Sequence, residues 1–147
     1  MTPPYAALIV IASTVILINY RILFPALAGR IVHRNRKGEQ GKVVAVIDGD
    51  TIKVSIDGKV QTVRYIGINA PERGQLGADE ATQLNRRLVM DKWVRMEADQ
   101  RDEDQYGRKL RYVWVGRKLV NRALYQRGVV DIMAIKPNTK RIEEIES

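Results

Sequence analysis

Two carboxylates flank a glycine in the segment Asp48-Gly49-Asp50, which lies between two runs rich in β-branched residues. Mg²⁺ and Ca²⁺ prefer oxygen ligands, so this spacing is suited to a divalent cation. The segment is equally typical of an ordinary tight turn, because aspartate and glycine are favoured turn residues. Taken alone, it leaves both interpretations open.

A second group of oxygen donors, Asn69-Ala70-Pro71-Glu72, directly follows a third β-branched run. Pro71 holds Ala70 in an extended conformation. Such a loop can direct a side-chain oxygen, a main-chain carbonyl and a glutamate toward one place. An ordinary loop at the end of a strand has the same sequence character, so this segment also needs a structural context.

Two arginines stand at positions from which they could bind phosphate. Arg64 lies inside the third β-branched run, where it needs a partner or a solvated face, and Arg108 follows Tyr106-Gly107 at the entry to a later strand. Guanidinium groups bind phosphate oxygens bidentately. Each arginine by itself is also typical of a salt-bridged surface residue.

The composition limits the chemistry that is available. The chain has no cysteine, which excludes disulfides and thiolate chemistry, and its one histidine, His33, lies in a basic linker. Catalysis therefore has to use carboxylates, arginines, lysines or tyrosines. The net charge of +8 favours polyanionic partners, either nucleic acid or anionic lipid.

The alternation of apolar residues predicts five strands and two helices, with a short third helix in the C-terminal tail. One helix falls between the third and fourth strands, which is the element order of an OB-type barrel. We therefore expect an α+β fold: a five-stranded OB-type β-barrel with two to three helices, preceded by one N-terminal apolar helix. The predicted strands are Lys42–Ile47, Thr51–Ile56, Val60–Ile68, Trp93–Ala98 and Arg108–Val115, and the helices are Ala78–Asp91 and Leu119–Arg127.

The N-terminal part of the chain predicts a membrane anchor or a signal peptide. Tyr5–Ala28 is apolar apart from a short interruption, and as a helix it would measure about 36 Å at ~1.5 Å per residue, enough to span a bilayer. Basic residues follow it, so the positive-inside rule places the remaining chain in the cytoplasm. Ala26-Leu27-Ala28 instead resembles a signal-peptidase site, which would make the protein secreted. We thus expect an anchor or signal peptide over 1–29, a basic linker over 30–40 and one domain over 41–147.

The motifs gain specificity from their order. V-I-D-G-D-T is followed by the in-strand Arg64, then by N-A-P-E, Y-G-R and a helix that begins with Leu119-Val120-Asn121. From about Gly41 to Asn138 this pattern closely resembles the staphylococcal-nuclease-like (thermonuclease) family. The resemblance implies a nuclease that hydrolyses DNA, RNA or both, acts as a monomer and uses one divalent metal ion, with Ca²⁺ preferred over Mg²⁺ or Mn²⁺.

The same resemblance implies a role for each motif residue. Asp50 would ligate the metal with Asp48 behind it, while Asn69 would supply a side-chain oxygen and Ala70 a main-chain carbonyl. Three further residues would act on the substrate: Glu72 would orient or deprotonate the attacking water, and Arg64 and Arg108 would clamp the phosphate.

This chain departs from the family pattern at several places, among them a short segment after Glu72 and a truncated C-terminal helix. The family often has an aspartate where Asn69 stands, so one negative charge is absent from the implied metal site. Asp131–Ile135 contains no tyrosine, so stacking on a nucleotide base is not expected there. The alternative function is a catalytically silent OB-type module that binds nucleic acid or protein. Such a module has no reason to retain the full set of Asp50, Arg64, Glu72 and Arg108.

Overall fold

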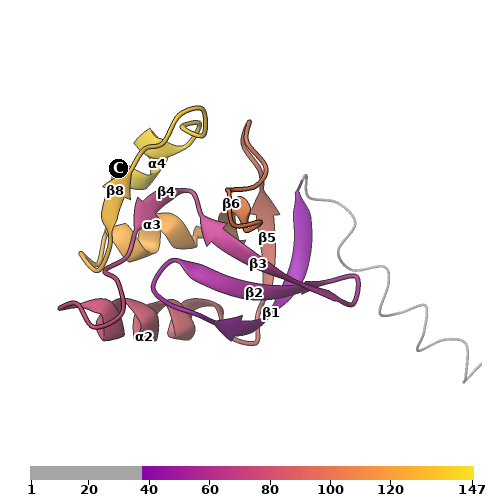
Figure 1. Ribbon diagram of the computed structural model, residues 1–147, viewed down its shortest axis with the longest axis horizontal. Coiled ribbons are helices and arrows are strands. Elements are labelled where there is room, and N and C mark those ends of the chain that lie inside the picture. The colour runs from indigo at the N-terminus through magenta and orange to yellow at the C-terminus, as the bar shows by residue number, and fades with distance from the viewer. Residues whose placement is uncertain (1–37) are drawn as a thin grey trace, which may run out of the picture. The chain divides into compact units, whose positions relative to one another are not determined.

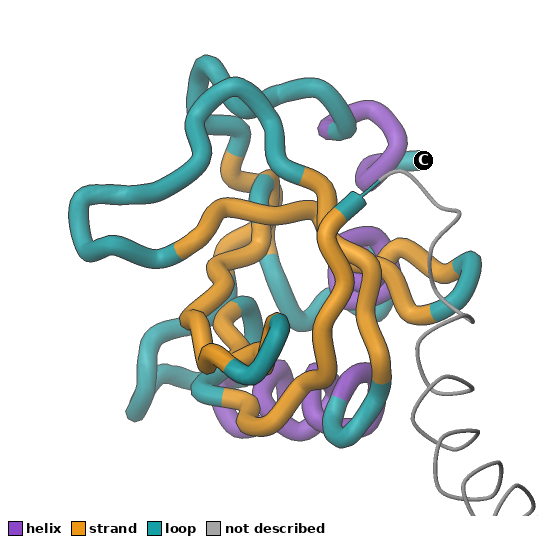
Figure 2. The backbone as a smooth tube through the Cα atoms, turned by 90° about the vertical axis from the view of Figure 1, so that its right-hand side faces the viewer, coloured by secondary structure: helices purple, strands orange, loops and turns teal. Residues whose placement is uncertain are grey.

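The computed structural model describes residues 38–147, whose strands close into a β-barrel (Figures 1 and 2). Antiparallel pairing joins the strands in the order β3-β2-β1-β5-β6, and a parallel pairing between β3 and β6 closes the barrel. The predicted five-stranded OB-type α+β fold is therefore confirmed. The barrel strands are β1 (Glu39–Val46), β2 (Thr51–Ile56), β3 (Lys59–Tyr65), β5 (Trp93–Glu97) and β6 (Lys109–Val115).

Three helices accompany the barrel in the described part of the chain: α2 (Ala78–Val89), α3 (Val120–Tyr125) and α4 (Ile142–Glu146). Helix α2 buries one stripe of residues, including Ala81 and Val89, and exposes Arg86 and Arg87 on the other side, as its amphipathic pattern predicts. Helix α3 is shorter than expected, because β7 (Lys118–Leu119) precedes it and a turn at Gly128, with φ of 68°, follows it.

The predicted long strand Val60–Ile68 is wrong, because it breaks after Tyr65. Gly67 adopts a φ of +83°, which side chains other than glycine rarely tolerate, and β4 (Gly67–Asn69) runs in a separate pairing. Its partner is β8 (Asp131–Met133), a strand that the sequence does not predict. The break therefore brings Asn69 and the loop that follows it (residues 69–72, called the Asn69 loop below) beside β8 from the C-terminal part of the chain.

Two buried asparagines connect the helices to the barrel. Asn85 of α2 accepts a hydrogen bond from the Tyr65 hydroxyl at 2.9 Å, and its amide donates to the Asp48 carbonyl at 2.9 Å. Asn121 of α3 accepts from the Val113 N–H at 3.0 Å and donates to the Ile66 carbonyl at 2.8 Å. Asn85 thus fixes the turn that carries the two aspartates against α2.

The predicted anchor or signal peptide over 1–29, and all but the last residues of the linker over 30–40, lie outside the described residues. Strand β1 begins at Glu39, earlier than the predicted Lys42, and pairs with β5 from its first residue. Among residues 38–147, no helix is long and apolar enough to cross a membrane.

Candidate active site

The turn between β1 and β2 places Asp50 in a buried position beside the Asn69 loop. One carboxylate oxygen accepts a hydrogen bond from the Ala70 N–H at 2.6 Å, and the other accepts from the Thr51 hydroxyl at 2.9 Å. Asp48 supports the turn by accepting from the Asp50 N–H at 3.0 Å. Burial raises the pKa of the Asp50 carboxyl, and the nearby Arg64 guanidinium only partly opposes this. The structure thus joins the two oxygen-donor segments of the sequence.

Tight packing around Gly49 keeps this turn close to the Asn69 loop. A Cβ atom at Gly49 would lie 2.6 Å from the Cβ of Ala81 on α2 and 2.7 Å from the Cβ of Ala70. A larger residue would have to push apart the aspartate turn, the helix and the loop. Glycine is therefore required here by close approach, in addition to its general preference for turns.

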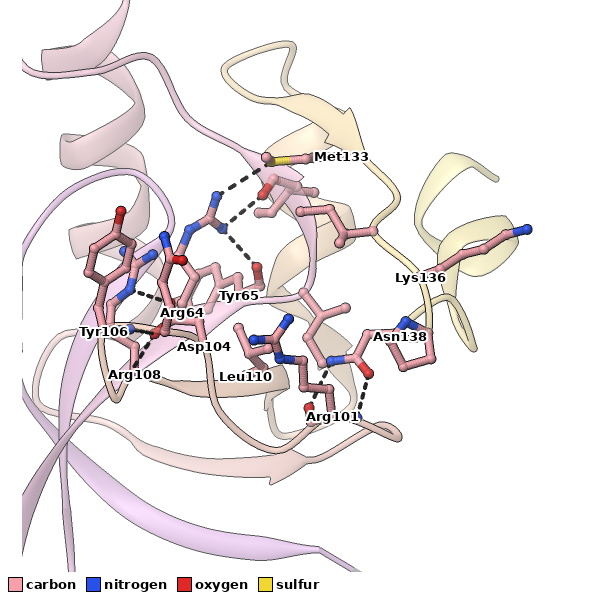
Figure 3. Close-up of a pocket in the computed structure, with 16 residues that line it drawn as sticks. Arg64, Tyr65, Arg101, Asp104, Tyr106, Arg108, Leu110, Met133, Lys136 and Asn138 are labelled. Atoms are coloured by element: carbon pink, nitrogen blue, oxygen red, sulfur yellow. Dashed lines mark hydrogen bonds and ion pairs between the residues drawn. The ribbon is translucent and has the colours of Figure 1, made fainter.

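The Arg64 guanidinium is held by several protein acceptors at the end of β3 (Figure 3). Its Nε lies 3.1 Å from Asp50 Oδ1, and its Nη1 donates to the carbonyls of Tyr65 and Ile68, each at 2.8 Å. Its Nη2 donates to Asn69 Oδ1 at 2.9 Å and lies 4.0 Å from the Met133 sulfur. A guanidinium has five N–H donors, so the donor beside this weak sulfur acceptor can bind an anion without breaking a strong contact.

A second arginine, Arg108, is positioned by Asp104 in the turn that leads into β6. The Asp104 carboxylate accepts from Arg108 Nε at 2.6 Å and from the Arg108 N–H at 3.0 Å. Burial opposes ionisation of Asp104, but the hydrogen bonds from Arg108 and Tyr106 outweigh it and lower the pKa of this carboxyl. Because the Asp104 carboxylate is ionised and accepts two hydrogen bonds from Arg108, it holds the Arg108 side chain in one orientation.

Arg64 and Arg108 line a common cavity of about 330 Å³, although they lie far apart in the sequence. The parallel pairing of β3 with β6 brings them together, since it sets Arg64 opposite Leu110. The cavity combines cationic groups with an apolar lining, and most of its lining residues were not predicted from the sequence. Those that bear on function are Arg101, Asp104, Tyr106, Leu110, Met133 and Ile135.

Leu110 belongs to the predicted strand β6, but no local sequence signal identifies most of the others, because they come from the loop after β5 and from the segment around β8. Tyr106 is the exception, since it belongs to the Y-G-R motif. Its ring lies 5.4 Å from the Arg108 guanidinium carbon and its side chain is largely exposed. Met133 and Ile135 bring aliphatic side chains to the cavity from the tyrosine-free segment noted in the sequence.

Glu72 lies outside this group of contacts. Its N–H donates to Gln75 Oε1 at 2.8 Å, and the residue is exposed in the loop between β4 and α2. Among residues 38–147 its carboxylate forms no hydrogen bond or ion pair, and it does not line the cavity. The predicted role of Glu72 in orienting water therefore stays a prediction.

The oxygen donors near Asp50 suit a hard cation. The Asp50 carboxylate and the Asn69 amide oxygen both contact the guanidinium of Arg64, at 3.1 and 2.9 Å, so that two oxygen donors lie close together. Within the described residues, no three Asp, Glu, His or Cys side chains gather into a group that could hold a metal. A bound ion would therefore depend on Asp50 together with amide and main-chain oxygens.

Comparison with known proteins identifies the family. The sequence pattern of the staphylococcal nuclease homologues matches residues 62–147, which include Arg64, Glu72 and Arg108. The chain belongs to this family. A thermonuclease of Staphylococcus hyicus is 34% identical over 146 residues, which covers 95% of this chain and 86% of that protein.

Further relatives of this nuclease homologue include a second thermonuclease and an endonuclease. The thermonuclease of Staphylococcus intermedius is 36% identical over 110 residues, 71% of this chain and 66% of that protein. Endonuclease YncB of Bacillus subtilis is 38% identical over 106 residues, 67% of this chain and 50% of that protein. These thermonuclease and endonuclease relatives support a nuclease function for the chain.

Proposed function

We propose that this protein is a divalent-metal-dependent nuclease that hydrolyses phosphodiester bonds in DNA and RNA. The observation that carries the proposal is the position of Arg64. Its guanidinium contacts Asp50 and Asn69 on one side and lines, with Arg108, a cavity on the other. Two fixed guanidinium groups facing one cavity suit a phosphate, whose non-bridging oxygens gain negative charge in the transition state.

In this proposal the metal ion binds at Asp50, with Asn69 and the Ala70 carbonyl as further oxygen ligands and Asp48 supporting the turn. We propose Ca²⁺ as the ion, with Mg²⁺ and Mn²⁺ as alternatives, because Ca²⁺ accepts flexible, oxygen-only coordination. The ion would supply Lewis acidity to the phosphate. Asp50 is suited to this role because its buried carboxylate is stabilised by a cation.

The chain's own residues would divide the remaining work. Arg64 and Arg108 hold the phosphate from two directions, and Glu72 orients or deprotonates the attacking water. Glu72 is exposed, and its carboxylate has no hydrogen-bond or ion-pair partner among residues 38–147, so this group is available to solvent. A glutamate base near water needs no histidine, which agrees with the composition.

The test is a cleavage assay with the full-length chain on single- and double-stranded DNA and RNA, with Ca²⁺, Mg²⁺, Mn²⁺ or EDTA. We expect cleavage that requires a divalent ion and is abolished by EDTA. Arg64→Ala and Arg108→Ala should each lower kcat by ~10²-fold or more, the scale for losing a donor to a developing charge. Arg117→Ala, an exposed arginine that does not line this cavity, is the matched control.

The second candidate function, a silent nucleic-acid or protein binding module, is favoured by the absence of Glu72 from the lining of the cavity. It predicts binding without cleavage under every metal condition, and substitutions at Glu72 that change nothing. Full activity in an Arg64→Ala/Arg108→Ala double variant, with the fold intact by circular dichroism, would exclude the catalytic assignment of both arginines.

We further propose that the protein is anchored in a membrane by Tyr5–Ala28, with its folded domain in the cytoplasm, and that the domain acts as a monomer. The support is the sequence: a long apolar segment followed by basic residues. After carbonate extraction the protein should remain in the membrane pellet, and protease added to intact cells should not reach the domain. A soluble form that begins at Gly29 would favour the signal-peptide interpretation and secretion.

A further inference from the structure

A third arginine faces the cavity that Arg64 and Arg108 share. Arg101 lies in the loop between β5 and β6 and belongs to the cavity lining. Figure 3 shows its side chain turned toward the cavity, whereas the neighbouring Lys136 side chain points away. No motif in the sequence indicated this residue.

The backbone of Arg101 is fixed by a buried amide. Its N–H donates to Asn138 Oδ1 at 2.7 Å, and its carbonyl accepts from Asn138 Nδ2 at 2.8 Å. Asn138 is only 5% exposed, so these two hydrogen bonds are shielded from water. The side chain is also restrained, because Arg101 Nε donates to the Glu103 carbonyl at 3.0 Å. The hydrogen bonds of the Arg101 backbone and Nε thus fix the orientation of its two terminal Nη groups.

Arg101 has no carboxylate partner among residues 38–147, although three acids follow it directly in the sequence. Each of those acids pairs with a cation other than Arg101. Asp102 pairs with Lys109 and Arg111, Glu103 pairs with Lys109, and Asp104 pairs with Arg108, all at 2.6–2.7 Å. The three acids of the loop therefore neutralise Arg108, Lys109 and Arg111, and the charge of Arg101 is left facing the cavity.

We propose that Arg101 binds a second phosphate of the substrate, one nucleotide away from the phosphate held by Arg64 and Arg108. This inference rests on the proposed nuclease function and names its substrate class: strands that carry a phosphate next to the scissile diester. A positioned guanidinium with free Nη donors matches the oxygens of such a phosphate. Asn138 is then a positioning residue, because it acts through the backbone of Arg101.

The test uses the full-length chain and three thymidine dinucleotides: TpT, pTpT with a 5′-phosphate and TpTp with a 3′-phosphate. For the wild-type chain, kcat/KM should be higher for one phosphorylated dinucleotide than for TpT. Arg101→Ala should lower kcat/KM for that dinucleotide about tenfold, the scale of one charge-assisted contact, mainly through KM. It should leave TpT cleavage unchanged, and Arg101→Lys should restore part of the loss. Arg117→Ala, which lines a different hollow, is the control.

The variant Asn138→Asp tests whether Asn138 positions Arg101 or only stabilises the fold. It retains an acceptor for the Arg101 N–H and loses the donor to the Arg101 carbonyl. We expect the same phosphate-selective loss as in Arg101→Ala, with TpT cleavage maintained. An equal loss on all three dinucleotides would show that Asn138 has a purely structural role.

The outcomes separate this inference from the proposed function. A wild-type chain that cleaves TpT and the phosphorylated dinucleotides equally, or an Arg101→Ala variant that is impaired equally on all three, overturns the second phosphate site and leaves the nuclease proposal standing. A wild-type chain that cleaves neither the dinucleotides nor longer DNA and RNA overturns the nuclease function itself.

Discussion

The amide oxygen of Asn69 accepts a hydrogen bond from Nη2 of Arg64 at 2.9 Å. The Nε of the same guanidinium lies 3.1 Å from Asp50 Oδ1, so one arginine connects two of the proposed metal ligands. The geometry couples the proposed metal site to the phosphate clamp. A substitution that changes the charge at position 69 should therefore affect both metal binding and phosphate binding.

Asn69→Asp should lower the divalent-ion concentration needed for half-maximal cleavage. At the effective dielectric of ~20 typical of protein sites, one unit charge facing another at ~4 Å contributes on the order of 4 kcal/mol. Desolvation of the new carboxylate and its pairing with Arg64 cancel most of this Coulomb energy. A net gain of even ~1.4 kcal/mol would raise the affinity for the divalent ion tenfold. The measurement is a metal titration of cleavage by the wild type and the variant.

The matched control for this titration is Asp131→Asn. Asp131 is the exposed cross-strand partner of Asn69, and its charge is screened by solvent, so the titration should change little. Unchanged or weaker metal affinity in Asn69→Asp would show that Asn69 is not a ligand and that the proposed site around Asp50 is drawn incorrectly.

Asp104→Asn should lower kcat about tenfold, because the amide loses the charge and one of the acceptors that orient Arg108. If Asp104 acts only through Arg108, adding Asp104→Asn to Arg108→Ala should cause no further loss of kcat. Steady-state kinetics of the single and double variants give this comparison. Asp102→Asn is the control: this exposed acid pairs with Lys109 and Arg111 and should affect stability more than kcat.

Gly67→Ala should destabilise the fold by about 2–3 kcal/mol, combining the cost of a positive φ with overpacking. A Cβ here would lie 2.7 Å from Ile142 Cδ1 and 2.9 Å from Ile145 Cδ1. Gly74→Ala is a matched control, since Gly74 has a φ of +87° but nothing within 4 Å of its added Cβ. Urea unfolding of both variants isolates the packing contribution, and equal losses would show that α4 does not restrict this position.

Acidification should weaken the fold partly through Glu97. Burial opposes its ionisation, but hydrogen bonds from Arg141 and Lys140, at 2.7 and 2.6 Å, outweigh it and lower its pKa below the ordinary 4.5. Arg95, 3.9 Å away, adds a third positive charge. A depressed folded pKa means that the stabilisation is fully present above pH 4.5 and is lost as the pH falls through the folded pKa.

The measurement is thermal unfolding of the wild type and Glu97→Gln from neutral to strongly acidic pH. At neutral pH the variant should be less stable by about 1–2 kcal/mol, since hydrogen bonds to charged groups are lost. The difference should shrink as the pH falls below 4.5. A difference that is constant over the whole range would mean that ionisation of Glu97 contributes nothing.

Local patterns predicted most of the elements in the described part of the chain. The alternation around Tyr112 and Trp114 predicts β6, and the Asp57-Gly58 turn predicts the β2–β3 hairpin, because both signals arise within a few residues. The order of the motifs also predicted the family, and with it Asp50, Arg64 and Arg108 as site residues. Patterns of this kind follow from side-chain periodicity and turn chemistry, which need no long-range contacts.

The composition and motif order alone thus determined the barrel class, the absence of thiol chemistry and the nuclease family. Only the tertiary structure decided that β3 ends at Tyr65 and that Gly67 follows with a positive φ, because the residues of α4 that leave no room for a side chain at Gly67 are remote in the sequence. The tertiary structure also decided that Arg101 faces the cavity. Its backbone is bound by Asn138, which lies 37 residues later in the sequence, and the neighbouring acids form ion pairs with other cations. Such partner choices depend on which segments the closed barrel brings together, and no local pattern encodes them.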